Sequence, residues 1–268
     1  MNKISILGGG NIGRAMAEGL LYSGSCKPGD ICITRRNHEL LADLEEKGIN
    51  TRKPNKEAVS FSEMVILAVQ PGQAEELIKE ISLEIDPRKH LIVSVVAALK
   101  IKEIKRLIGK EVPVIRIMPN TAIAICESMT CIAADEKDNA AMDKVRALFD
   151  TLGSTIVISE SLMKAATIIG ACGIAFFLRY IRAASQGGIQ VGFHASEAQF
   201  IAAQTARGAA SILLRTGSHP EDELDKDTTP RGCTIAGLNE MEHNGFSSAL
   251  IKGIVTSYGE LDQLVEKG

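Results

Sequence analysis

Near its start the chain reads Lys3-Ile4-Ser5-Ile6-Leu7-Gly8-Gly9-Gly10-Asn11-Ile12-Gly13, an apolar run that passes directly into a glycine-rich turn. In the G-x-G-x-x-G pattern the first glycine allows a tight turn, the second lets a pyrophosphate approach the backbone, and the third lets a helix pack on a strand. The helix expected over residues 14–21 offers unpaired N–H groups to phosphate charge. Because the motif lies between a strand and a helix, it predicts a dinucleotide site formed by Gly8, Gly10, Asn11, Ile12 and Gly13.

The end of the second expected strand indicates which dinucleotide is bound. An NAD site usually places Asp or Glu about 20 residues after the glycine motif, where it holds the ribose 2′-hydroxyl. This chain has Thr34-Arg35-Arg36-Asn37 there, with two cations and no acid. A guanidinium matches a 2′-phosphate, which a carboxylate would repel. The pattern therefore predicts NADP, with NADPH preferred over NADH; the alternative is that Arg35 and Arg36 form only a solvated turn.

Strand and helix patterns alternate through the first half of the chain. Residues 65–69 and 91–96 are continuous apolar runs, as expected for strands covered on both faces of a parallel sheet. The alternation predicts an α/β fold, a Rossmann-like doubly wound and mostly parallel sheet over residues 1–159. We expect strands at 3–7, 30–34, 64–69, 90–96, 114–118, 129–134 and 155–159, with helices at 38–47, 73–80 and 101–108.

Helical patterns replace strand patterns after residue 159, which predicts an all-α C-terminal domain over residues 160–268. Residues 195–214 are rich in Ala, Ser and Gly, which suits close helix packing or a subunit interface, although alanine's helix propensity alone favours the same composition. The weakly charged stretch 165–178 is shorter than the roughly 20 residues that cross a bilayer, so we expect a buried helix. So much apolar helix predicts a dimer built mainly after residue 159. Ser218 and Glu221 have the spacing of a capping box.

Composition narrows the class of protein further. The 268 residues are 45% hydrophobic and 24% charged, with a net charge of -3. These values are ordinary for a globular protein, and the net charge does not favour binding to nucleic acid. We expect no signal peptide, no membrane partner and a cytoplasmic location. The six cysteines show no CxxC pair, so we expect reduced thiols and no metal.

Besides the glycine loop, four further segments are distinctive: Ala68-Val69-Gln70-Pro71, Arg116-Ile117-Met118-Pro119-Asn120-Thr121, Ala203-Gln204-Thr205 with Gly208-Ala209-Ala210, and Thr229-Pro230-Arg231-Gly232-Cys233-Thr234-Ile235-Ala236-Gly237-Leu238 followed by Glu242, Gly245 and Phe246. Together these segments resemble the pyrroline-5-carboxylate reductase family, and the resemblance covers nearly the whole chain. The most specific of them is the segment that begins at Thr229, which resembles the family's signature, commonly Ser-Pro-Gly-Gly-Thr-Thr.

The resemblance implies a dinucleotide domain followed by a helical domain that dimerises through interlocking helices, giving a homodimer or a higher homo-oligomer. It implies NADPH-dependent reduction of 1-pyrroline-5-carboxylate to L-proline, the last step of proline biosynthesis. The substrate's carboxylate and ring nitrogen would meet Thr229, Arg231, Gly232, Cys233 and Thr234, supplied across the dimer interface. The implied cofactor residues are Gly8, Gly10, Asn11, Ile12, Gly13, Thr34, Arg35, Arg36, Asn55, Ala68, Val69, Gln70, Pro71, Val96, Ala97 and Asn120.

The chain departs from the family pattern at several positions. Gln70 replaces a lysine, Ala122 a proline, and Gly173-Ile174-Ala175-Phe176 a Gly-Pro-Ala-Tyr-like turn. Cys233 stands where threonine is common, although a backbone N–H contact would survive that change. Arg231 replaces the first glycine of the signature pair, so a Cβ and a guanidinium occupy the space in which the backbone should approach the ligand. The guanidinium either pairs with the substrate carboxylate or excludes the substrate.

Reduction of a C=N bond asks little of side chains, because the cofactor carries the hydride and the protein fixes distance, orientation and charge. A protonated imine is already a good electrophile, so a hydroxyl near the ring nitrogen is enough, and we assign that catalytic role to Thr234. We expect His194, His219 and His243 to be helix caps or surface residues. Two alternatives stay open. One is another NADP-dependent imine or hydroxy-acid oxidoreductase, with Lys164 as the candidate proton donor; the other is a non-catalytic NADP-binding protein.

Overall fold

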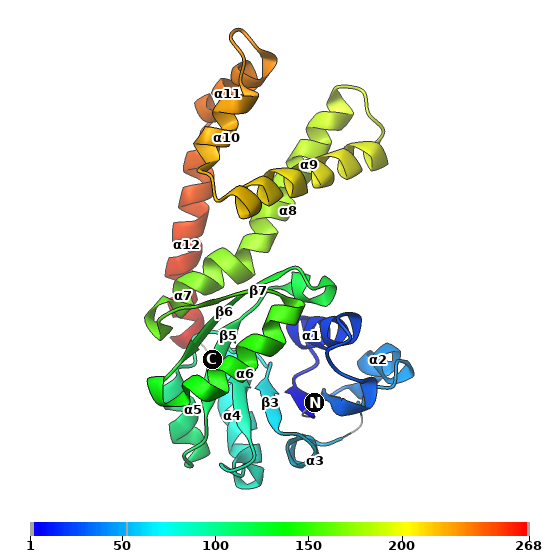
Figure 1. Ribbon diagram of the computed structural model, residues 1–268, viewed down its shortest axis with the longest axis vertical. Coiled ribbons are helices and arrows are strands. Elements are labelled where there is room, and N and C mark those ends of the chain that lie inside the picture. Colours follow the sequence, from blue (N-terminus) through cyan, green and yellow to red (C-terminus); the bar gives the residue numbers. More distant parts are fainter. Residues whose placement is uncertain (1–2, 52, 267–268) are drawn as a thin grey trace. The chain divides into compact units, whose positions relative to one another are not determined.

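The computed structural model describes residues 3–51 and 53–266, with side chains as far as residue 261. Within these residues one sheet has seven strands in the order β2-β1-β3-β4-β5-β6-β7. Figure 1 shows this sheet among the helices of the first part of the chain. All neighbouring strands are parallel except β5 and β6, which are antiparallel. The predicted doubly wound, mostly parallel sheet is thereby confirmed. The strands are β1 (Ile4–Leu7), β2 (Ile31–Thr34), β3 (Met64–Leu67), β4 (Leu91–Ser94), β5 (Val114–Met118), β6 (Ser128–Ala134) and β7 (Gly153–Val157).

The expected strand limits differ from the observed ones where the chain turns out of the sheet. The apolar runs expected at 64–69 and 90–96 leave the sheet after Leu67 and Ser94, and their last residues form loops beyond the strand ends. The seventh strand begins at Gly153, two residues earlier than expected. Gly153 lies against the backbone of Ser128 on β6, where a side chain would overlap the neighbouring strand. The apolar pattern thus predicted where the strands lie but not the residues at which they begin and end.

Two separate cores cover the two faces of the sheet. Along β3, Met64 and Ile66 enter one core, whereas Val65 and Leu67 enter the other. Both faces of the strand are therefore buried, which explains its continuous apolar run. Helices α1 (Asn11–Tyr22), α2 (Ala42–Glu46) and α6 (Asn139–Phe149) pack in the first core, and α3 (Asn55–Phe61), α4 (Pro71–Ile81) and α5 (Ile101–Ile108) pack in the second.

One helix runs from Glu160 to Gln190, through η7 (Glu160–Leu162), α7 (Met163–Ala166), the π-helical turn η8 (Thr167–Cys172) and α8 (Gly173–Gln190). Its 31 residues are long and apolar enough to cross a membrane, by length and composition alone. The side chains of Phe177 and Leu178 are 68% and 59% exposed. Ala166, Thr167 and Ile168 in the same stretch are buried, so the expected buried helix is found only in part within the single chain.

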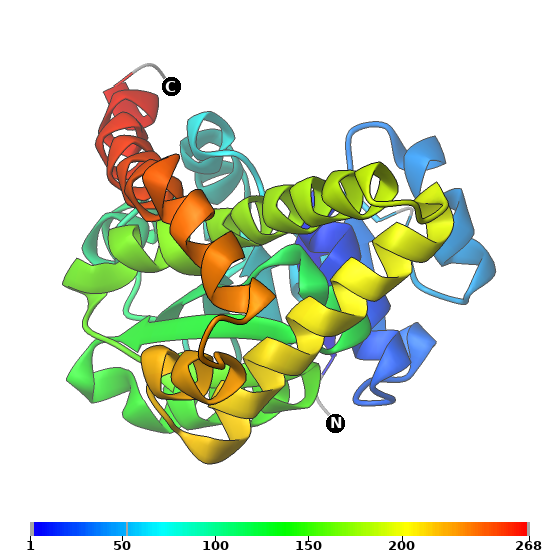
Figure 2. The same cartoon turned by 90° about the horizontal axis from the view of Figure 1, so that it is seen from above.

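The chain divides into two compact units, Met1–Cys172 with Ser257–Gly268, and Gly173–Thr256. The second unit is helical throughout, as predicted for this part of the chain. Its first two helices, α8 and α9 (Ala195–Thr216), form a hairpin (Figure 2) in which a Cβ on Gly188 would lie 3.0 Å from that of Ala198, so small residues permit the close approach. The helices that follow are α10 (Pro220–Asp227), α11 (Cys233–His243) and α12 (Phe246–Glu266), and the residues of α12 from Ser257 onward are assigned to the first unit.

The three histidines of the helical region lie at helix ends, as expected. The backbone N–H of His194 donates to Glu197 at 3.1 Å at the start of α9. Nδ1 of His219 accepts the backbone N–H of Glu221 at 3.3 Å. The capping box expected from Ser218 is therefore wrong, because α10 begins at Pro220 and its N-cap position falls on His219. His243 is the last residue of α11.

Candidate active site

The predicted cofactor residues gather at the carboxyl ends of parallel strands. Gly8 follows β1, Thr34 ends β2, Ala68 follows β3, and Val96 lies shortly after β4. Because β1 to β5 are mutually parallel, these ends meet at one edge of the sheet. In the order β2-β1-β3, the chain crosses from β1 to β2 on one side of β1 and then returns to β3 on the other side. Open α/β sheets bind ligands at such a switch point.

The glycine loop is shaped partly by the protein's own packing and partly by space left for a ligand. Gly8 has φ +121°, and a Cβ there would overlap the carbonyl of Ala68. A Cβ on Gly13 would overlap the carbonyl of Gly8. Around Gly10, in contrast, no atom lies within 4 Å of the Cβ position. Asn11 and Ile12 open α1 beside this space, so their backbone N–H groups are available to a pyrophosphate.

The segment after β2 is tied to the glycine loop. The Thr34 carbonyl accepts from the N–H groups of Gly8 and Gly9 at 3.2 and 2.7 Å, and Arg35 Nη1 donates to the Gly9 carbonyl at 2.7 Å. Arg36 pairs with Glu76 at 3.5 Å, with both side chains about 80% exposed, so this ion pair adds little stability. Arg35 thus lies beside the glycine loop, and Arg36 stays at the surface.

Asn55 lies against the same segment at the start of α3. Its Oδ1 accepts from the Thr34 hydroxyl at 2.7 Å, and its Nδ2 donates to Glu80 at 2.8 Å. The Thr34 side chain is buried, so its hydroxyl needs such a partner. The structure therefore brings Thr34 and Asn55 together, although 21 residues separate them in the sequence.

The loops after β3 and β4 complete the predicted cofactor set. Ala68 and Val96 are buried, whereas Gln70 is exposed at the start of α4 with Pro71 as its first residue. Val69 and Ala97 are partly exposed near the strand ends. The neighbouring residue Ala98 has φ +62°. This left-handed conformation costs a non-glycine residue about 1–2 kcal/mol, and no pattern in the sequence pointed to it.

Asn120 is held by contacts within the protein. Its Oδ1 accepts the N–H of Ala122 at 3.1 Å, and its Nδ2 donates to the carbonyl of Gly170 at 3.2 Å. Gly170 lies in the π-helical turn η8, which leaves backbone groups outside the regular helical pattern. The amide of Asn120 therefore joins the end of β5 to the long helix, and its predicted contact with cofactor stays a prediction.

A partly buried ion pair between β5 and the long helix was not assigned any role from the sequence. Arg116, at the middle of β5, is 4% exposed, and its Nη1 lies 3.1 Å from Glu160 Oε1. The same oxygen accepts the backbone N–H of Ile101, the first residue of α5, at 2.7 Å. Glu160 therefore ties the start of the long helix to both β5 and α5. The available signal was a lone arginine in an apolar strand, which requires a partner when buried.

The predicted substrate segment forms a tight turn before α11. The N–H of Gly232 donates to the carbonyl of Thr229 at 2.9 Å, with Pro230 and Arg231 between them. Arg231 has φ +63°. Proline at the second position and a positive φ at the third define a type II turn, whose third position favours glycine. Arg231 therefore stands where the backbone itself prefers the glycine of the family signature.

The turn leads directly into the N-terminus of α11. Gly232 is the N-cap residue, without a side-chain cap, and a Cβ there would lie 2.7 Å from the Thr229 hydroxyl oxygen. Cys233 and Thr234 are the first two residues of the helix, and both are exposed. The structure thus brings the five predicted substrate residues together, with backbone N–H groups and a hydroxyl at one helix end.

Other reactive side chains of the described chain are engaged elsewhere. The ammonium of Lys164 lies 3.8 Å from the ring centroid of Tyr258. The six thiols form no disulfide, and burial raises the pKa of Cys32 to about 11. No three side chains among His, Cys, Asp and Glu of the described residues gather closely enough to hold a metal ion. The expected lack of metal and thiolate chemistry stays a prediction.

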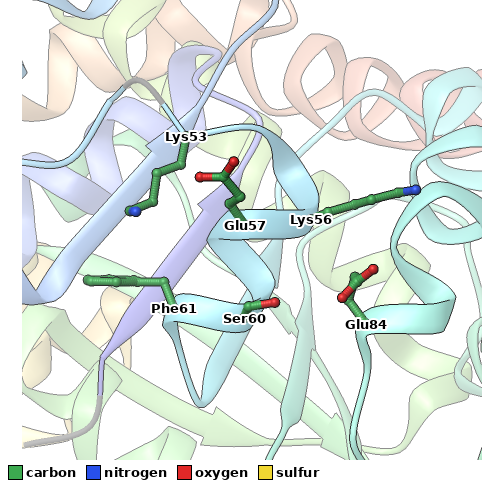
Figure 3. Close-up of a pocket in the computed structure, with 6 residues that line it drawn as sticks. All are labelled: Lys53, Lys56, Glu57, Ser60, Phe61 and Glu84. Carbon is green, nitrogen blue, oxygen red and sulfur yellow. The ribbon is translucent and has the colours of Figure 1, made fainter.

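A hollow of about 500 Å³ lies elsewhere on the sheet unit (Figure 3). The ammonium groups of Lys3 and Lys53 lie 4.5 and 5.7 Å from the ring centroid of Phe61 beside it. None of the residues that line it was predicted to bind cofactor or substrate, and the hollow is open to solvent. It is lined by Lys53, Lys56, Glu57, Ser60, Phe61 and Glu84.

The sheet, its glycine loop at the switch point and the helical unit that follows define a class, the dinucleotide-dependent oxidoreductases with a helical C-terminal domain. Comparison with protein families agrees with this class in both halves of the chain. Residues 3–98 match the family described as NADP oxidoreductase, coenzyme F420-dependent. Residues 160–264 match the family described as pyrroline-5-carboxylate reductase dimerisation.

Similar proteins specify the family. Pyrroline-5-carboxylate reductase 1 of Dictyostelium discoideum is 47% identical over 96% of this chain, and this chain spans about half (48%) of that protein's length. Pyrroline-5-carboxylate reductase 2 of the same organism is 45% identical over 95% of this chain and 90% of its own length. The chain belongs to the pyrroline-5-carboxylate reductase family.

A solved structure has the same fold. The pyrroline carboxylate reductase of Plasmodium falciparum, whose crystal structure has NADP bound, matches with a TM-score of 0.87. The match covers 98% of both chains at 21% sequence identity. At that identity the likeness concerns the fold, which is shared along the whole chain although four residues in five differ.

Proposed function

We propose that this protein reduces 1-pyrroline-5-carboxylate to L-proline with NADPH as the hydride donor. The observation that carries the proposal is a family relationship along the whole chain, combined with a glycine loop at the switch point of the sheet. The reaction is an oxidoreduction of a CH–NH group, and its substrate is a small molecule. Neither nucleic acid nor a membrane is needed, and we place the protein in the cytoplasm.

The cofactor site fits a dinucleotide that carries a 2′-phosphate. The open space at Gly10 accepts the pyrophosphate, and Arg35, which lies against the glycine loop, supplies a cation to the 2′-phosphate together with Arg36. The remaining contacts come from Gly8, Asn11, Ile12, Gly13, Thr34, Asn55, Ala68, Val69, Gln70, Pro71, Val96, Ala97 and Asn120. NADPH, when bound, supplies the hydride. A relative with NADP bound supports NADP as the cofactor, and the two arginines support a preference for NADPH over NADH.

The substrate site lies in the turn and first helical residues from Thr229 to Thr234. The backbone N–H groups at the start of α11, including that of Cys233, meet the substrate carboxylate where the helix dipole favours negative charge. The Thr234 hydroxyl hydrogen-bonds the ring nitrogen and holds the imine in the orientation for attack. The Arg231 guanidinium is exposed beside the turn and pairs with the carboxylate. Gly232 allows the turn to close on Thr229.

The active protein is a homodimer or a higher homo-oligomer, in which the helical region supplies the substrate residues to the cofactor site of a partner. The dimerisation family matched by residues 160–264 supports assembly, and so do the exposed apolar side chains of the helical unit. We accordingly divide the chain by function into residues 1–159, which bind cofactor, and residues 160–268, which assemble. Sedimentation of the intact protein as a stable monomer at micromolar concentration contradicts this part of the proposal.

A direct assay follows NADPH absorbance after addition of 1-pyrroline-5-carboxylate, with NADH as the matched cofactor control. The expected result is turnover with NADPH, lower turnover with NADH, and none with a small hydroxy acid in the reverse direction. NADPH binding without reduction of any cyclic imine identifies a non-catalytic NADP-binding protein and defeats the proposed activity. Turnover of a hydroxy acid, abolished by Lys164→Met, identifies the alternative dehydrogenase chemistry.

A further inference from the structure

The side chain of Arg14 connects the helix that begins at the glycine loop with the segment that follows Arg35 and Arg36. Arg14 lies in the first turn of α1. Its Nη1 donates to the Leu40 carbonyl at 2.7 Å and to Asp43 Oδ1 at 3.0 Å, and its Nη2 donates to Asp43 Oδ2 at 2.6 Å. The contact with Asp43 is therefore bidentate, the geometry in which guanidinium and carboxylate bind most specifically. These contacts cross 26 to 29 residues of sequence.

The Arg14–Asp43 pair owes its defined geometry to several hydrogen bonds made by one guanidinium. The Arg14 side chain is 25% exposed and that of Asp43 is 49% exposed, so solvent screens the charge attraction between them. The hydrogen bond from Arg14 lowers the pKa of the Asp43 carboxyl below its usual value. A weaker contact of Arg14 with Glu18, at 3.4 Å, stays within α1 and holds no other segment.

The segment with the two arginines is consequently fastened on both sides. Before it, the Thr34 carbonyl accepts two N–H groups of the glycine loop. After it, Leu40 and Asp43 are bound to Arg14, where the 3-10 turn η2 (His38–Leu41) meets α2. Residues 35–39 span the interval between these two attachments. Their position relative to the glycine loop therefore depends on the Arg14–Asp43 pair as well as on β2.

We propose that Arg14 and Asp43 are positioning residues that set the preference for a 2′-phosphate, by fixing the arginine-bearing segment against the glycine loop. They act through Arg35 and Arg36 and make no cofactor contact of their own. The inference rests on the proposed function, because it presupposes NADPH in this site. The pyrophosphate and nicotinamide parts of NADPH and NADH are identical, so a shift of residues 35–37 affects NADPH and leaves NADH binding unchanged.

Positioning and simple charge make opposite predictions for one of the two residues. If the pair acted through charge alone, loss of the Asp43 carboxylate would strengthen NADPH binding and loss of the Arg14 guanidinium would weaken it. If the pair acts by holding the segment, either loss weakens the same attachment. Asp43→Leu leaves Arg14 with the Leu40 carbonyl, so Arg14→Met weakens NADPH binding at least as much as Asp43→Leu does, and the double change weakens it no further than Arg14→Met.

The test is titration of NADPH and NADH into the intact protein and into Arg14→Met, Asp43→Leu and the double variant. Glu18→Gln is the matched control, because it removes the partner of Arg14 that lies within α1. We expect Arg14→Met and the double variant to lose roughly tenfold in NADPH affinity and Asp43→Leu to lose at most as much, with NADH affinity unchanged. Glu18→Gln should retain the full preference.

The inference is overturned by tighter NADPH binding of Asp43→Leu, by additive losses in the double variant, or by equal losses of affinity for NADPH and NADH. The unmodified protein separates this inference from the proposed function. An unmodified protein without a preference for NADPH contradicts the proposed cofactor choice, and the inference falls with it. A preference that is present and survives in all variants overturns the inference alone.

Discussion

Replacing Arg231 by glycine should stabilise the helical unit, because the native residue holds a strained backbone. Arg231 has φ +63° in a turn closed by the Gly232 N–H and the Thr229 carbonyl. That conformation costs a non-glycine residue about 1–2 kcal/mol. Glycine removes this strain but adds freedom to the unfolded chain, which costs about 0.4–1 kcal/mol. Since the side chain is exposed, little packing is lost, and the net gain is on the order of 0.5–1 kcal/mol.

Arg231→Ala is the control that isolates the backbone effect. Alanine removes the guanidinium but keeps the Cβ, so the strain stays. We expect the unfolding midpoint of Arg231→Gly to rise by about 2 °C and that of Arg231→Ala to stay near the native value. Thermal unfolding is followed by circular dichroism at one fixed protein concentration, because assembly shifts the midpoint with concentration. Equal midpoints for the two variants, or a lower midpoint for the glycine variant, refute the strain argument.

The same two variants separate the backbone from the chemistry of the guanidinium. Both lack the charge, so kcat/KM for 1-pyrroline-5-carboxylate should fall by roughly tenfold in each if Arg231 binds the substrate carboxylate. A rise in both variants shows instead that the arginine obstructs the site. If kcat/KM changes in Arg231→Gly but not in Arg231→Ala, the effect comes from the backbone of the turn. That result contradicts the role of Arg231 as a ligand of the substrate.

Three further predictions concern other sites. Arg35→Asp should narrow or reverse the preference for NADPH, measured by titration of both cofactors, because a carboxylate repels the 2′-phosphate; an unchanged affinity ratio contradicts the role given to Arg35. Thr234→Ala should lower kcat on the order of 10²- to 10³-fold while NADPH still binds, and a loss confined to cofactor affinity would show that the hydroxyl does not act on the substrate. Burial is the largest cause that lowers the pKa of His90, whose Nε2 has no partner among the described residues. Because the folded pKa is below the unfolded value of 6.5, stability should fall as the pH drops below about 6.5, where the unfolded chain gains its proton first. His90→Asn should flatten this part of the stability profile, and the same slope in the variant would rule His90 out as its source.

Features that depend on neighbours in the chain were predicted correctly. The glycine loop needs a strand before it and a helix after it, and all three lie within residues 3–22. The two-sided burial of the central strands is visible as continuous apolar runs, because each strand contributes alternate residues to the two cores. The absence of an acid beside Arg35 is equally local. The segment from Thr229 to Thr234 is contiguous, so its resemblance could group those residues; their role toward the substrate stays a prediction, and the left-handed backbone of Arg231 was not foreseen.

Contacts between distant segments could not be predicted in this way. The Asn120 amide meets Gly170 across 50 residues, and Arg116 meets Glu160 across 44. Such pairs have no sequence period, because they form only where the sheet and the long helix bring the segments together. The 165–178 stretch is buried only in part, because apolar composition does not show which of its residues pack inside the chain.

The sequence by itself determined the class of fold, the order of its two parts and the chemistry offered to a dinucleotide, because periodicity, glycine spacing and charge act over a few neighbouring residues. Only the tertiary structure showed that Arg14 hydrogen-bonds Asp43, that Thr34 hydrogen-bonds Asn55 and that Asn120 hydrogen-bonds the long helix at Gly170. Each of these contacts depends on how strands and helices far apart in the chain are placed side by side. That placement results from packing the two faces of the sheet, which no local pattern encodes.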